Sequence, residues 1–187
     1  MLADFTPTAE TISLHGLGFI QVKLPANRRL HVWHPDLPRR ACYEHSAVHN
    51  HRFSFRSTVL VGEQVNRRWN VHIAHPDDMA QHRLISHNGP RSAKGGRLSR
   101  EVAHCNLECH SVEYYREGES YVMPELAYHD TPNNGIVVTL MEKLLEGTVH
   151  ASTIIHHSAK FDQDFDRFQL PPEDLWGYVC LALGANV

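Results

Sequence analysis

The chain is a succession of short segments rich in β-branched and aromatic residues, and this feature most constrains its fold. Turn-forming Gly, Pro and Asn separate the segments, most of which are too short for an amphipathic helix. Many short strands with almost no helix between them are typical of a β-sandwich or a β-barrel. We therefore predict an all-β fold. The predicted strands cover residues 19–24, 29–33, 54–61, 65–74, 108–116, 120–123, 136–140 and 148–155.

One short helix is expected, at residues 171–184. Pro171 and Pro172 suit its first positions, and Glu173 and Asp174 suit the positive end of its dipole. Apolar residues then recur at helical spacing and form a stripe, which packs either on the sheet or on a second copy of the chain. A homodimer is compatible with the second of these alternatives.

The chain is predicted to form a single domain over residues 1–187, with a β core that spans residues 18–156. Its length is sufficient for one hydrophobic core. Residues 75–101 are polar and rich in Gly, Ser and Arg. We predict a long loop there, and loops of this length are either functional or disordered.

Composition argues against several classes of protein. No apolar run approaches the roughly 18 residues that a membrane-spanning helix needs. The first residues show no basic segment followed by an apolar core, so no secretory signal is expected. The four cysteines are too few for a disulfide framework in a chain of 187 residues. We therefore expect a cytoplasmic protein with reduced thiols and no membrane partner.

The formal net charge of −3 conceals an uneven distribution. Residues 1–116 hold 15 Lys and Arg against 10 Asp and Glu, whereas residues 117–187 hold 3 against 11. Because the arginine pairs of the basic half are dispersed and no helix carries a basic face, we expect no nucleic-acid partner. The expected partner is a small-molecule substrate.

Histidine is unusually abundant, with 16 of 187 residues, and imidazole is the commonest metal ligand in proteins. His49 and His51 stand two residues apart, before the apolar segment that ends at Gly62. Residues two apart in a strand project from the same face, so both imidazoles would point into a barrel interior. The pair predicts half of a site for a divalent metal ion.

A second segment runs from Gly118 to Asn133 and contains Pro124 and His129. Its spacing resembles the second motif of the cupin superfamily, which places a glycine, a proline, a histidine and an asparagine in this register. Leu126 stands where that motif has an inner glycine.

The pair His49 and His51, together with Gly62, resembles the first cupin motif, in which a His-x-His pair precedes a glutamate and then a glycine. The glutamate is missing here. Phe55 or Arg56 stands at its position, depending on whether a bulge shifts the register of the strand. The two motifs follow each other in the cupin order.

The resemblance implies a cupin-type double-stranded β-helix, or jelly-roll barrel, with one divalent metal ion per chain held by His49, His51 and His129. Without the glutamate, this neutral three-histidine set is similar to that of the thiol dioxygenases, the cupin branch typified by cysteine dioxygenase. The implied function is a non-heme iron dioxygenase that acts on a small anionic substrate. Fe(II) is the expected metal, with zinc, nickel and manganese as alternatives, because three imidazoles alone do not select the metal.

Four further side chains are candidates for catalysis. Arg56 would bind a substrate carboxylate through its guanidinium if a bulge turns it inward, whereas plain alternation leaves it in solvent. Glu108, His110 and Tyr114 share one face of their strand. Glu108 and His110 lie either near the metal, as partners of its ligands or as an acid–base pair, or on a solvated face. Tyr114 either supplies a hydroxyl to the same pocket or packs in the core.

Two other functions are consistent with the same motifs, because a fold by itself does not determine a function. One is a metal-dependent isomerase or hydrolase. The other is a non-catalytic cupin that binds a small ligand. The missing glutamate fits dioxygenase chemistry, and it also fits a site that has lost its metal.

Overall fold

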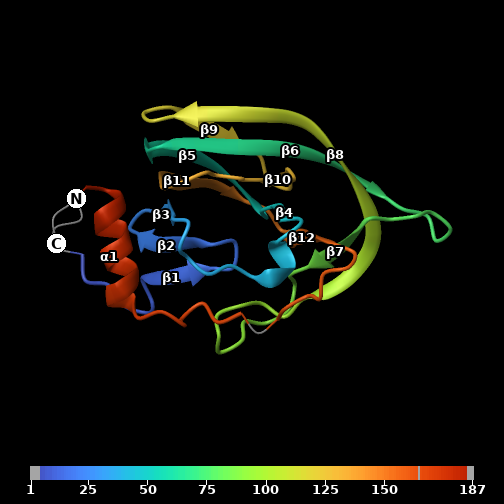
Figure 1. Cartoon of the computed structure of the whole chain (residues 1–187), viewed down its shortest axis with the longest axis horizontal. Helices are drawn as coiled ribbons and strands as arrows, with labels where there is room; N and C mark the ends of the chain where they lie inside the picture. The colour runs from blue at the N-terminus through green and yellow to red at the C-terminus, as the bar shows by residue number, and fades with distance from the viewer. Residues whose placement is uncertain (1–4, 164, 185–187) are drawn as a thin grey trace.

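The computed structural model describes residues 5–163 and 165–184. These residues form twelve strands, one short 3-10 helix, η1 (Ala41–Tyr43), and one α-helix, α1 (Pro172–Ala182). The paired strands are antiparallel and belong to two sheets (Figure 1). The prediction of a β-rich fold with one C-terminal helix is confirmed, and the two sheets are compatible with a barrel of the jelly-roll kind.

The first sheet has the strand order β1-β2-β3-β11-β5-β9. Its strands are β1 (Ile12–His15), β2 (Phe19–Leu24), β3 (Arg28–Trp33), β11 (Val137–Glu146), β5 (Phe53–Val61) and β9 (Ser120–Met123).

The second sheet has the order β10-β4-β12-β7-β8-β6 and closes on itself, because β10 pairs with both β4 and β6. Its strands are β10 (His129–Asp130), β4 (Val48–His49), β12 (Ser152–His156), β7 (His82–Ser86), β8 (Arg100–Arg116) and β6 (Glu63–Ile73). The two-residue strands β4 and β10 carry two of the three predicted metal ligands, His49 and His129.

Strands β1 to β3 have an apolar outer face and an inner face that is polar apart from Phe19 and Trp33. The apolar face packs against α1 in one buried cluster (Figure 1). The opposite face carries Ser13, His15, Gln21 and Arg29, which line cavities inside the molecule. Because residues alternate between the two faces of a strand, the apolar residues are used under the helix and leave polar ones for the interior.

The apolar stripe of α1 packs on the sheet of its own chain. Leu175 and Val179 are buried there, and Trp176 stacks on Phe5 with the ring centroids 4.5 Å apart. This contact settles the alternative that the sequence left open for the stripe. No helix of the described residues is long and apolar enough to cross a membrane.

The prediction of a continuous loop over residues 75–101 is wrong. Residues His82–Ser86 form β7, which pairs with β8 on one side and with β12 on the other. The strand has few apolar residues, and for that reason the sequence did not indicate it. Ile85 is only 2% exposed, because its side chain packs in a buried apolar cluster with Phe19 and Ile155. Residues 87–99 connect β7 to β8 and line the interior cavity at several points.

Gly62 makes the tight connection between β5 and β6. Its φ of +80° lies in the region that favours glycine, and an added Cβ would meet the backbone oxygen of Ile136 at 2.5 Å. The glycine that resembles a cupin marker is therefore required by the turn and by close backbone approach.

We expect Gly62→Ala to lower the free energy of unfolding more than Gly118→Ala does. Gly118 has nearly the same φ, +85°, but an added Cβ there meets no heavy atom within 4 Å. The control variant therefore loses only the backbone term, about 1–2 kcal/mol, and Gly62→Ala adds the clash with Ile136. Urea denaturation measures both, and equal losses would contradict the argument.

Candidate metal centre

Three histidines converge where β4 and β10 pair. His49 and His129 are direct partners in the ladder, and His51 follows two residues after His49. The ring centroids are 4.5 Å apart for His49 and His129, 4.9 Å for His49 and His51, and 5.2 Å for His51 and His129. One ligand atom from each ring lies within 4.8 Å of the others. Across residues 5–163 and 165–184, no other group of three or more His, Cys, Asp or Glu side chains brings its ligand atoms together in this way.

Backbone carbonyls set the orientation of two of the rings. The Nδ1 of His49 lies 2.9 Å from the carbonyl oxygen of Ala47, and the Nδ1 of His129 lies 3.0 Å from that of Ala127. A carbonyl only accepts, so each Nδ1 carries the proton and donates it. The Nε2 lone pair of each ring is then left for a metal ion, which is the usual arrangement of a metal-binding histidine.

Burial keeps the three imidazoles neutral. It lowers the pKa of His49, His51 and His129, and the neighbouring histidines lower the pKa of His51 and His129 further. Neutral rings are the form that binds metal ions. The three side chains are therefore in the correct protonation state at neutral pH.

Phe55 occupies the position that a cupin glutamate would have. It is buried, with its ring centroid 5.2 Å from that of His51. Arg56 is exposed and lies outside the cavities described below, so plain alternation holds there, and the candidate catalytic role that needed a bulge to turn Arg56 inward is wrong. The register shift near Arg56 falls on β11, between Lys143 and Leu145, and therefore β5 keeps its plain alternation from Phe53 to Val59. A second shift skips Leu60 of β5, beyond this stretch.

The predictions for Glu108, His110 and Tyr114 are also wrong, because β8 points these three side chains into solvent. The Glu108 side chain is 65% exposed, Tyr114 is 63% exposed, and His110 is exposed as well. The opposite face of β8 points inward, because Cys105 and Leu107 belong to the apolar cluster between the strands. Burial also raises the pKa of the Cys105 thiol to about 11.

The inward face of β8 carries a different acid and tyrosine. Glu113 accepts hydrogen bonds from the Arg68 Nε at 3.1 Å and from the Tyr115 hydroxyl at 3.2 Å. The Tyr115 ring lies 4.7 Å from that of Tyr121, inside the sheet. The sequence could not identify the inward face of β8, because polar residues occupy both of its faces, and neither Glu113 nor Tyr115 lines the cavities described below.

An ion pair holds the strand that carries His129. The next residue, Asp130, is buried and accepts hydrogen bonds from the Arg67 Nε at 2.9 Å and from the Trp69 Nε1 at 3.0 Å. Both donors lie on β6, which pairs with β10. The third histidine is therefore positioned by its neighbour's contacts with a long strand.

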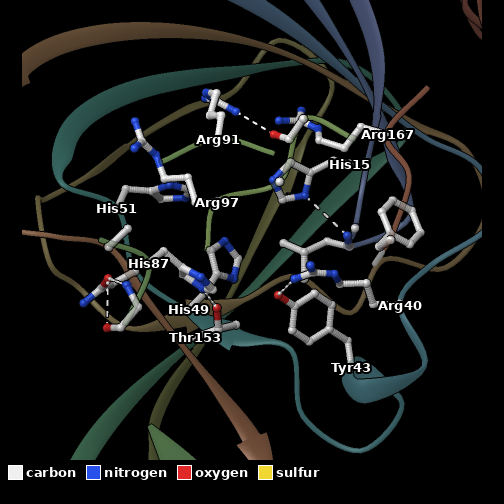
Figure 2. A pocket seen from close by; sticks show the side chains of 18 residues that line it. His15, Arg40, Tyr43, His49, His51, His87, Arg91, Arg97, Thr153 and Arg167 are labelled. Atoms are coloured by element: carbon white, nitrogen blue, oxygen red, sulfur yellow. Dashed lines mark hydrogen bonds between the residues drawn. The ribbon is translucent and has the colours of Figure 1, made fainter. Parts of the chain in front are cut away.

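A cavity of about 210 Å³ opens at His49 and His51 (Figure 2). A second cavity of about 440 Å³ shares part of its wall. Among the described residues that line either cavity there is no aspartate or glutamate. The first cavity is lined by Arg40, Arg91, Arg97 and Arg167.

No local sequence pattern marks these four arginines. Arg91 and Arg97 lie in the predicted loop, Arg40 belongs to one of the dispersed arginine pairs, and Arg167 follows the β core. Arginine outnumbers lysine 14 to 4 in the chain, but this excess does not indicate which arginines gather in the fold.

The comparisons with known proteins add no assignment to this geometry: no family model matches the chain, and no curated protein matches it.

We expect Glu113→Gln to lower the free energy of unfolding by about 1–3 kcal/mol, because it removes the carboxylate that pairs with Arg68, whose side chain is only 11% exposed. Glu108→Gln on the same strand is the matched control. Its partner is the exposed His72, so the loss should stay below about 0.5 kcal/mol. Urea titrations compare the two, and a larger loss in the control would reverse our assignment of the inward face.

Proposed function

We propose that this protein is a metal-dependent enzyme of the cupin type, a non-heme iron dioxygenase that acts on a small anionic substrate. The observation that carries the proposal is the convergence of three neutral imidazoles, two of which, His49 and His51, line an arginine-rich cavity. The order of the two histidine motifs and the β-rich fold support the cupin assignment.

The side chains present fit a divalent transition-metal ion. His49, His51 and His129 offer three nitrogen donors, and imidazole suits iron, zinc and nickel. The Nδ1 protons of His49 and His129 are held by carbonyls, so the Nε2 atoms of these rings carry the lone pairs that can bind a metal ion. When bound, Fe(II) would supply open coordination positions for substrate and the electrons that oxygen chemistry requires.

The residues around the three histidines favour an anionic substrate. A neutral ligand set leaves the positive charge of a bound ion uncompensated, and the arginines of the cavity add to that charge. Phe55 supplies an apolar wall beside His51, where a fourth, carboxylate ligand would otherwise stand. This wall keeps water from that side and leaves the cavity side for substrate.

The proposed metal site predicts the metal content of the protein. Protein purified without chelator or added metal should contain close to one ion per chain, and His49→Ala and His129→Ala should each lose most of it. His110→Ala is the control, because His110 is exposed on β8. Elemental mass spectrometry measures the content. If His49→Ala and His129→Ala both kept wild-type metal content, the proposed metal site would be refuted.

The next prediction concerns the reaction. Iron-loaded protein should consume oxygen when supplied with its substrate from a panel of small acids that includes thiols. His129→Ala should abolish the uptake and His110→Ala should leave it unchanged. An oxygen electrode measures the rate. Iron-loaded protein that consumes no oxygen with any acid of the panel would refute the dioxygenase assignment and favour an isomerase, a hydrolase or a binding protein.

A further inference from the structure

We propose that the ligand of this cavity is a small molecule with at least two acidic groups, carboxylate or phosphate, and that Arg91, Arg97 and Arg167 bind it between the three histidines and the cavity mouth. The inference rests on the proposed function in taking the cavity as the substrate site. It narrows the substrate from an anion in general to a polyanion.

The first observation is the number of cations and their distribution. Arg91, Arg97 and Arg167 line both cavities, while Arg40 lines only the one at His49. The second cavity has further cationic side chains in its lining, so positive charge extends from the first cavity, at His49 and His51, into the second. These further cations are Lys23, Arg29, Arg52 and Lys143.

The second observation is the shortage of carboxylates to balance this charge. Arg52 and Lys143 both pair with the single carboxylate of Glu146, each at 2.7 Å. Arg29, Arg40, Arg91, Arg97 and Arg167 have no ion pair with a described carboxylate.

The polar contacts of these five arginines go to neutral groups. Arg91 and Arg97 each donate to a carbonyl of their own loop, at 2.8 Å and 3.1 Å. Arg167 donates to the Leu14 carbonyl at 3.0 Å. Neutral acceptors leave the charge uncompensated and leave further N–H groups of each fork free for a ligand.

The third observation concerns Arg40, which lines the first cavity. Arg40 is only 9% exposed, and its Nε has no hydrogen-bond partner in the described structure. Its guanidinium packs over the rings of Tyr43 and Phe161, and its Nη1 donates to the Tyr43 hydroxyl at 3.3 Å. A buried charge with an unsatisfied donor is unfavourable unless a ligand completes it.

The crowding of cations also shows in their titration. Burial and the neighbouring guanidiniums of Arg91, Arg29 and Arg40 lower the pKa of Arg167 to about 10. The same causes, burial first and arginines next, lower the pKa of His87 to about 4. Mutual repulsion of this kind destabilises the empty cavity, and an anion relieves it.

Two acidic groups follow from the layout. A single carboxylate accepts one bidentate guanidinium fork well, yet the cations are distributed over two joined cavities of about 210 and 440 Å³. A ligand with separated acidic groups can contact cations in both cavities. These volumes suit a small molecule, since small-ligand sites commonly measure about 300–1,000 Å³.

The test is anion binding to metal-free protein, measured by calorimetry at constant ionic strength. The probes are acetate as a monoanion, succinate and citrate as polycarboxylates, and inorganic phosphate and pyrophosphate as phosphates. We expect citrate or pyrophosphate to bind at least about tenfold more tightly than acetate. A preference for citrate identifies a polycarboxylate ligand, and a preference for pyrophosphate identifies a phosphorylated one. Equal affinity for acetate would overturn the proposal.

Variants assign the effect to the cavity. Arg91 and Arg97 are exposed and lie in the connection between β7 and β8. Arg91→Gln and Arg97→Gln should each weaken polyanion binding about tenfold. Arg97→Lys keeps the charge but loses the fork, so it should recover part of the affinity. Arg56→Gln is the matched control, since Arg56 is exposed outside both cavities. An equal loss in Arg56→Gln would indicate unspecific attraction and refute the site.

The two proposals can fail separately. Because the anion titration uses metal-free protein, it does not depend on the three histidines holding an ion. Tight polyanion binding by a chain that takes up no metal would uphold the arginine site and refute the proposed function. Metal binding with no preference for polyanions would uphold the metal site of the proposed function and refute the arginine site.

Discussion

The pairing of β10 with β4 and β6 is the contact on which the site depends. It closes the second sheet, and it brings His129 beside His49 although the two residues are eighty positions apart in sequence. A strand of two residues has too few ladder bonds to hold itself. The buried carboxylate of Asp130 therefore matters, because its bonds to Arg67 and Trp69 fix β10 on β6. The orientation of a candidate metal ligand thus rests on an ion pair one residue away.

The arrangement of β1 to β3 explains why a β-rich protein of this size has a polar interior cavity. Most of their apolar residues face outward and are covered by α1, whereas the inner face combines polar residues with Phe19 and Trp33. The helix therefore supplies most of the hydrophobic contacts of these three strands and leaves part of the inner face free to line a polar cavity. His15 and Arg29 reach the cavity from this inner face.

Charge divides the interior into two parts. The three histidines are neutral, because burial lowers their pKa values, and Phe55 adds no charge beside them. The arginines on the cavity side remain cationic, and their described partners are almost all neutral. A neutral ligand set beside a cationic cavity favours anions at the position where a substrate would meet a bound ion.

The sequence by itself indicated most of the long strands, the helix and the three histidines, but not the short strands β1, β4, β7 and β10. It could do so because these are local patterns: alternation in a strand places His49 and His51 on one face, and apolar spacing marks α1. Tertiary structure decided the rest. The inward face of β8 was set by the packing of Cys105, because both of its faces carry polar residues. Strand pairing decided between the two alternatives for Arg56, because the bulge near it lies on β11 and leaves the alternation of β5 unchanged there. The arginine cavity gathers residues from Arg40 to Arg167, and only the closed fold brings such distant positions together.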